Sequence, residues 1–94
     1  MLVRISHYEM PVGNLVHAEK WAVESAIPAV RKQGAIHGYW AVDRKTGKSI
    51  VVSFWKDEAT ASASWKAGGI RADAESKFGA KLTGVETYEV FGQL

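Results

Sequence analysis

Hydrophobic and polar positions alternate with two different periods along the chain, and the changes of period predict its strands and helices. Residues 3–8 alternate as in a short strand, and the segment 10–13, which contains a proline and a glycine, ends it. Residues 14–33 show a helical period. The apolar stripe of this helix consists of Leu15, Ala18, Ala22 and Ala26. We expect Asn14 to cap its start, Gly34 to close its end and Pro28 to kink it.

The second half of the chain predicts three strands and one interrupted helix. Residues 36–44 and 49–55 are rich in aromatic and β-branched residues, as in strands, and the polar turn 45–48 joins them. Asp57 can cap a helix over residues 58–67, which Gly68 and Gly69 interrupt before it resumes over 70–78 and ends at Gly79. Residues 85–91 read as the last strand. The order β-α-β-β-α-β predicts an α+β, ferredoxin-like fold: an antiparallel sheet with helices on one face.

The predicted strands are apolar on both faces. Ile50, Val52 and Phe54 alternate with Val51 and Trp55 along the third strand. Two helices can cover only one face of a sheet, so the other needs a different partner. We therefore expect a homodimer in which two copies pack sheet on sheet.

Composition narrows the class of protein. Ninety-four residues make one domain, 1–94, and the formal charge of +2 does not indicate a nucleic-acid partner. The absence of cysteine excludes disulfides and thiolate metal sites and is compatible with the cytoplasm, where we place the protein. We expect neither a signal peptide nor a membrane span.

The sequence Gly47-Lys48-Ser49 has the ending of a phosphate-binding loop, but its surroundings contradict that interpretation. Such a loop has another glycine five positions earlier, where this chain has Val42, and a helix directly afterwards. Here a predicted strand follows. We interpret the segment as the tip of a hairpin and expect no bound nucleotide.

Two other functions common to this topology are also disfavoured. In RNA-recognition domains the third strand carries aromatic side chains that stack on bases, whereas residues 48–55 place aliphatic residues there. The three histidines, His7, His17 and His37, lack the spacing of a metal site, so we expect no metal.

Three stretches carry a resemblance to a known family: VRISHYEMPVG (3–13), GAIHGYWAVDRKTGKSIVVSFWKDEATASASW (34–65) and GVETYEVF (84–91). Through them the whole chain resembles the dimeric α+β barrel proteins, in particular the antibiotic-biosynthesis-monooxygenase-like domains. The resemblance implies a homodimer whose paired sheets form a barrel, with a cavity between sheet and helices in each subunit. Known members oxidise anthrone- or quinol-type aromatic molecules with molecular oxygen and no cofactor, and others bind and degrade haem.

The resemblance also bears on haem. Haem-degrading relatives carry an Asn on the first strand, a Trp on the second helix and a haem-ligating His beyond that Trp. Ser6 stands near the Asn position and Trp65 matches the Trp, but residues 66–78 contain no histidine. We therefore expect no haem and no other cofactor.

Candidate site residues fall into three groups. His7 and His37 could act as catalytic bases, since imidazole titrates near neutral pH, although each could instead be a structural histidine. Ser6 and Tyr8 share one face of the first strand and could bind a polar group of the substrate. The proposed walls of an aromatic site, which could equally be plain core, are Trp40, Trp55, Trp65 and Phe78. The carboxylates offer no catalytic pair.

Two functions remain open from the sequence. The first is a small-molecule-binding α+β barrel that acts as a cofactor-independent monooxygenase on an apolar or aromatic substrate. The second is a non-catalytic ligand-binding or self-association module. An open cavity with a His or Tyr inside would favour the first, and a space filled with side chains the second.

Overall fold

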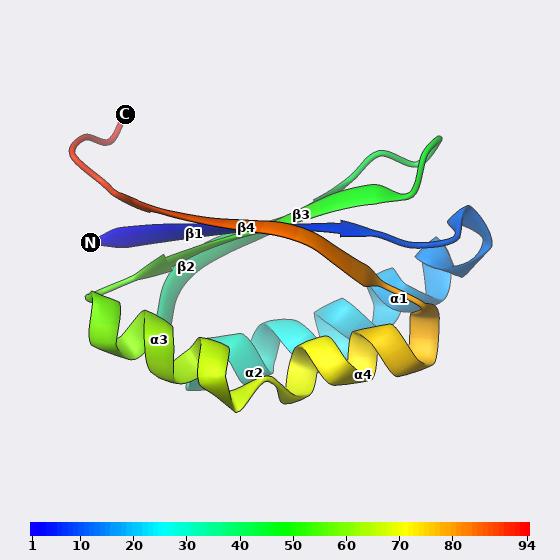
Figure 1. Ribbon diagram of the computed structural model, residues 1–94, viewed down its shortest axis with the longest axis horizontal. Coiled ribbons are helices and arrows are strands. Elements are labelled where there is room, and N and C mark those ends of the chain that lie inside the picture. The colour runs from blue at the N-terminus through cyan, green and yellow to red at the C-terminus, as the bar shows by residue number, and fades with distance from the viewer.

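A computed structural model describes residues 1–94, which form a four-stranded antiparallel sheet covered on one face by helices (Figure 1). The strands are β1 (Leu2–Glu9), β2 (Ala35–Val42), β3 (Lys48–Trp55) and β4 (Lys81–Glu89). They lie side by side in the order β2-β3-β1-β4. The predicted ferredoxin-like α+β fold is therefore confirmed.

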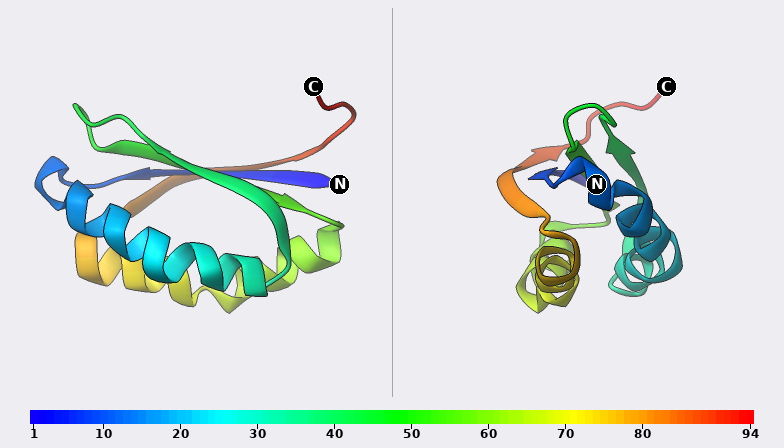
Figure 2. Two further views of the ribbon diagram at one scale, coloured as in Figure 1. Left: turned by 180° about the vertical axis from the view of Figure 1, so that it is seen from behind. Right: turned by 90° about the vertical axis from the view of Figure 1, so that its right-hand side faces the viewer.

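Two helical stretches run side by side beneath the sheet (Figure 2). The first contains a 3₁₀ turn η1 (Val12–Asn14), α1 (Leu15–Trp21), a widened π-helical segment η2 (Ala22–Ala26) and α2 (Ile27–Lys32). The second contains α3 (Glu58–Ala67) and α4 (Gly69–Phe78). None of these helices is long and apolar enough to cross a membrane.

The predicted stripe of the first helical stretch faces the sheet. Leu15, Ala18 and Ala26 are buried there, and Ala22 is half-buried. The expected distortion near Pro28 takes the form of η2, directly before it. Proline crowds the carbonyl four residues earlier, and widening of the preceding turns accommodates that carbonyl without ending the helix.

Four glycine turns and one helix cap follow the sequence predictions. Gly34, Gly47, Gly68 and Gly79 all have positive φ. Gly47 has φ +78° at the hairpin tip between β2 and β3. Strand β3 begins at the next residue, Lys48, so no helix follows Gly47 as a phosphate-binding loop would require. The Asp57 carboxylate caps α3 by accepting a hydrogen bond from the backbone N–H of Thr60 at 2.8 Å.

Two local predictions are wrong. Asn14 does not cap the first helix with its side chain, because its backbone is already helical (φ −95°, ψ −6°) where a capping residue is extended. Its side-chain amide N–H donates to the carbonyl oxygen of Phe78 at the end of α4, at 2.9 Å. The last strand runs over Lys81–Glu89 and not over 85–91. Its polar first residues extend the strand because β1 offers them an antiparallel partner, as in the pair Glu9 and Lys81.

The interior beneath the sheet is incompletely filled. Only 10 of the 94 residues are buried, and several of these are small: three alanines lie on the helices and two serines on the strands. These small side chains leave the space between the helices and the sheet unoccupied. This space is the origin of the cavity described below.

Candidate functional site

A cavity of about 530 Å³ lies between the sheet and the helices. Thirty residues line it, and twenty of them are hydrophobic. They come from β1, β2 and β3 on one side and from both helical stretches on the other. Its size lies within the range of roughly 300–1,000 Å³ that is usual for sites of small molecules.

Three polar residues of the cavity lie on β1. Successive residues of a strand point to opposite faces, so Arg4, Ser6 and Tyr8 all face the helices and all line the cavity. Ser6 is buried, while Arg4 and Tyr8 are half-buried. Ser6 and Tyr8, the two polar anchors expected from the sequence, thus lie together in the cavity.

Three of the four predicted aromatic walls line the cavity: Trp40 from β2, Trp65 from α3 and Phe78 from α4. Trp55 differs, because it is fully buried and absent from the lining. Its indole N–H donates to the hydroxyl oxygen of Ser53 at 2.8 Å. Trp55 is therefore part of the hydrophobic core and not of the cavity wall, and its indole N–H has a hydrogen-bond partner.

Two arginines surround the Trp65 ring. The guanidinium carbon of Arg71 lies 3.6 Å from the ring centroid, and that of Arg4 lies 5.0 Å away. Arg71 also donates to the backbone oxygen of Trp65 at 2.7 Å. Arg4 donates to the backbone oxygen of Ala61 at 2.7 Å and, more weakly, to the hydroxyl of Ser64 at 3.4 Å.

Burial changes the acid–base properties of this group. It lowers the pKa of Arg4, and the nearby positive charge of Arg71 lowers that pKa further. Burial also raises the pKa of Tyr8, against the opposite influence of Arg71 and Arg4. The Tyr8 hydroxyl is consequently neutral at physiological pH and can donate a hydrogen bond.

Both predicted catalytic histidines lie on the other face of the sheet. His7 alternates with Ser6 and Tyr8 along β1, and His37 lies on β2 in register with Phe54. Neither residue lines the cavity, whose lining contains no histidine or cysteine. No imidazole or thiolate is therefore available there to ligate a haem iron, and a base role for His7 or His37 stays a prediction that concerns the opposite face.

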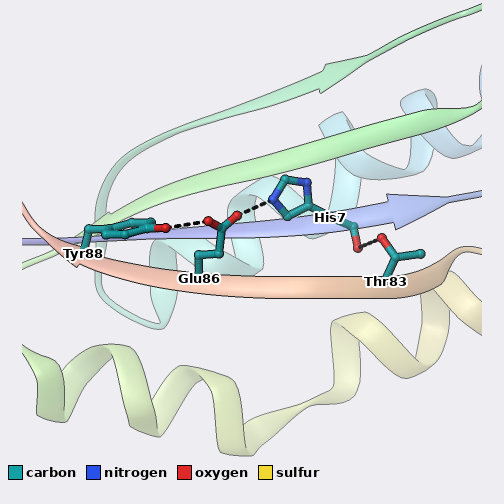
Figure 3. Close-up of polar contacts among 4 residues, drawn as sticks. All are labelled: His7, Thr83, Glu86 and Tyr88. Carbon is teal, nitrogen blue, oxygen red and sulfur yellow. Dashed lines mark hydrogen bonds and ion pairs between the residues drawn. The ribbon is translucent and has the colours of Figure 1, made fainter.

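On that face His7 belongs to a polar cluster with β4 (Figure 3). Its Nε2 atom lies 2.6 Å from Oε1 of Glu86, and the Tyr88 hydroxyl donates to Oε2 of the same carboxylate at 2.5 Å. The hydrogen bonds from Tyr88 and His7 lower the pKa of Glu86, and that carboxylate in turn raises the pKa of Tyr88. His37 has a different partner, because its Nε2 atom lies 2.8 Å from the Tyr39 hydroxyl.

Three residues of these sites were missed from the sequence: Arg4 and Arg71 in the cavity, and Glu86 beside His7. No sequence pattern indicated the pairing between Glu86 and His7. A sequence signal for Arg4 existed, since it shares the strand face of Ser6 and Tyr8. Arg71 and Glu86 depend on helix placement and on strand register, which no local pattern specifies.

Comparisons with known proteins identify the fold. No protein-family model matches the sequence, and no curated protein sequence is significantly similar to it. Solved structures are similar. HapK from Hahella chejuensis superimposes with a TM-score of 0.82 at 14% identity, covering 99% of this chain and 95% of HapK. A protein of Deinococcus radiodurans, named as a candidate antibiotic biosynthesis monooxygenase, gives 0.76 at 14% identity, covering 100% and 96%.

The haem degrader MhuD from Mycobacterium tuberculosis, solved with two haems in its active site, is also similar. It gives a TM-score of 0.69 at 21% identity, and the match covers 100% of this chain and 99% of MhuD. Identities this low establish the architecture and leave the chemistry of each cavity to its own residues. The chain thus has the ferredoxin-like α+β fold of the antibiotic biosynthesis monooxygenase domain proteins.

Proposed function

We propose that this protein binds a small apolar or aromatic molecule in the cavity between sheet and helices and oxidises it with molecular oxygen, without a cofactor. The observation that carries the proposal is the cavity itself: about 530 Å³, lined mostly by hydrophobic residues and by Tyr8. An unfilled cavity with a tyrosine inside favours a ligand site over a plain core. The similarity to antibiotic biosynthesis monooxygenases supports the choice of reaction.

The reaction class is the oxygenation of an anthrone-like substrate to the corresponding quinone, or of a quinol-like substrate to a hydroxyquinone. In an anthrone, the ring CH₂ group loses a proton, and the resulting carbanion gives its electrons to O₂ and forms a carbon–oxygen bond. Loss of the second hydrogen and cleavage of the O–O bond then leave a carbonyl group and one water. The substrate supplies all the electrons, so the balance is anthrone plus O₂ to quinone plus water.

In this scheme the protein positions the substrate and keeps water out. Ser6 and Tyr8 are the hydrogen-bonding groups for the substrate oxygen, and Trp40, Trp65 and Phe78 contact its rings. A hydrogen bond to that oxygen stabilises the carbanion, because the negative charge is delocalised onto it.

A specific observation favours the second candidate, a ligand-binding module without catalysis. The cavity lining contains no free base: its one carboxylate, Glu19, lies 2.6 Å from Arg44 in an ion pair, and His7 and His37 lie on the other face. Deprotonation would then depend on the acidity of the substrate alone.

Oxygen consumption distinguishes the two candidates. We expect the protein to accelerate O₂ uptake and quinone formation from an anthrone above the spontaneous rate, and Tyr8→Phe to reduce this acceleration by about tenfold to a hundredfold. His7→Ala and His37→Ala test the base role predicted for these two residues on the opposite face, and retained activity in both variants would dismiss that role. If the protein does not accelerate the reaction, ligand binding without catalysis is the function that remains. If the histidine variants lose activity while Tyr8→Phe stays fully active, the reaction takes place on the opposite face of the sheet.

We further propose that two copies associate through the uncovered sheet face. This face consists of Val3, Ile5, His7, His37, Tyr39, Ala41, Ile50, Val52, Phe54, Glu86 and Tyr88. Tyr39 and Tyr88 are 58% and 52% exposed in the single chain, and Phe91 and Leu94 are fully exposed in the C-terminal segment, which rises on the same side (Figure 1). Apolar surface of this kind is typical of protein interfaces.

Sedimentation velocity tests the association. We expect a mass of twice the 10.3 kDa of the chain, and a Val52→Glu variant should sediment as a monomer, because an unpaired carboxylate would be buried at the centre of the interface. A wild-type protein that is monomeric at micromolar concentration would contradict the proposal.

A further inference from the structure

Two guanidinium groups of the cavity carry positive charge that no carboxylate neutralises. Arg4 reaches the cavity from β1 and Arg71 from α4, and both line it. Neither forms an ion pair; the ion pairs of the structure join His7 to Glu86 and Arg44 to Glu19. Because Glu19 is the only acidic residue in the lining and is already paired, the cavity has an excess of positive charge.

The existing contacts of these arginines are all with neutral groups. Arg4 donates to a backbone oxygen and a serine hydroxyl, and Arg71 donates to a backbone oxygen. A guanidinium has five N–H donors, so each retains donors for a further acceptor. Both also contact the face of Trp65, which fixes their positions at the wall of an otherwise apolar cavity.

We propose that Arg4 and Arg71 form an anion subsite, and that the ligand of this cavity is a small aromatic molecule that carries an oxyanion: an ionised carboxyl, phenol or enol group. The inference rests on the proposed binding of an aromatic molecule here and specifies its charge. Burying two like charges together is unfavourable unless a negative charge joins them, and the forked donors of arginine match the two oxygens of a carboxylate. The neutral Tyr8 hydroxyl can donate to the same oxyanion.

A purely structural role explains part of this arrangement. Arg4 ties β1 to α3 through the carbonyl of Ala61, and Arg71 ties α4 to the end of α3 through Trp65. A neutral hydrogen-bond donor would meet these needs, however, without placing two cations beside each other. Their shared position at an apolar cavity is explained by an anionic ligand.

The test compares two probes of the same ring size: an anthracene carboxylate and the corresponding neutral anthracene methanol. Each is titrated with the intact protein while its fluorescence anisotropy is recorded. The variant is Arg71→Gln, which retains a side-chain donor for the Trp65 carbonyl and removes the charge. Arg31→Gln is the matched control, because Arg31 is exposed on α2 and does not line the cavity. Circular dichroism verifies that each variant is folded.

We expect the carboxylate to bind at least tenfold more tightly than the alcohol, and Arg71→Gln to weaken the carboxylate by about tenfold to a hundredfold while leaving the alcohol unchanged. Arg31→Gln should bind both probes as the wild type does. Equal binding of both probes, or equal losses in the two variants, would overturn the anion subsite and leave the proposed cavity site intact. Binding of neither probe would refute the cavity site and the subsite with it.

A third probe distinguishes a carboxylate from an ionised hydroxyl as the group recognised. A hydroxyanthracene changes its absorption spectrum when it loses its proton, so its ionised fraction can be read in the bound state. If the two arginines stabilise any oxyanion, the bound hydroxyl should ionise at lower pH than the free one, and Arg71→Gln should reduce this shift. A bound hydroxyl that titrates as in water would restrict the subsite to carboxylates, provided that the anthracene carboxylate binds as expected.

Discussion

The contacts of Trp65 with two arginines give a prediction that depends on one ring. Replacing Trp65 with Leu removes the aromatic face that lies 3.6 Å from the guanidinium of Arg71 and 5.0 Å from that of Arg4. Replacing it with Phe retains an aromatic face at the same position. Leu and Phe contribute similar amounts by burial, so the difference between the two variants isolates the attraction between ring and cations.

The magnitude follows from the two distances. A cation over an aromatic ring contributes about 0.5–1 kcal/mol when exposed and about 2 kcal/mol when desolvated, and both arginines here are half-buried. Since Phe is a weaker partner than Trp, we expect Trp65→Phe to be about 1–2 kcal/mol more stable than Trp65→Leu. The higher helix propensity of Leu acts in the opposite direction, so the expected order cannot come from propensity in α3.

Urea unfolding followed by circular dichroism measures this difference. In a chain of this size it corresponds to roughly 4–16 °C in Tm. Trp40 provides the control, because it lines the same cavity and no cation lies over its ring: there Phe and Leu should differ by less than about 0.5 kcal/mol. Equal free energies of unfolding for the two Trp65 variants would show that the contacts of Arg4 and Arg71 with the aromatic ring do not stabilise the fold.

Two further predictions concern the frame around the site. Gly47→Ala should lower the free energy of unfolding by about 2–3 kcal/mol, because Gly47 has φ +78° and a Cβ there would lie 2.0 Å from the backbone oxygen of Met10. Gly69→Ala is the control: a Cβ there would meet nothing within 4 Å, so this variant should change the free energy of unfolding by less than about 1 kcal/mol. Thermal unfolding of both variants measures the difference. For Asp57, hydrogen bonds from Thr60 lower the pKa, so its cap stabilises the fold above the ordinary value of 3.8 and this stability is lost as the pH falls through the folded-state pKa. Asp57→Ala should therefore unfold at lower urea concentration than the wild type at pH 7, and the difference should shrink in acid; a constant difference would contradict the cap.

Much of the frame was predictable because it depends on local chemistry. The left-handed turns need glycine, the first turn of α3 needs an acceptor such as Asp57, and the alternation along β1 puts Ser6 and Tyr8 on one face. The prediction for Asn14 shows the limit of this reasoning. A cap was expected from its position next to the helix, but the 3₁₀ turn η1 gives Asn14 a helical backbone, and its amide N–H bonds to the end of α4, a distant part of the chain.

The site was less predictable because it depends on which elements meet. Trp65 and Ser6 could be proposed from the sequence, but Arg71 joins them only because α4 lines the same cavity as β1 and α3. The histidines illustrate the same point from the other direction. Alternation along β1 places His7 opposite Ser6 and Tyr8, yet only the packing of the helices determines which of these faces encloses a cavity.

The proposed function and the anion subsite both depend on where an aromatic acid binds to the protein. A crystal structure of the protein with an anthracene carboxylate tests this most directly. We predict that the rings lie between the sheet and helices against Trp65 and Phe78, with the carboxylate within hydrogen-bonding distance of Arg4 and Arg71. A ligand bound only on the face that carries His7 and Glu86, or a cavity that stays empty at saturating ligand, would contradict both proposals.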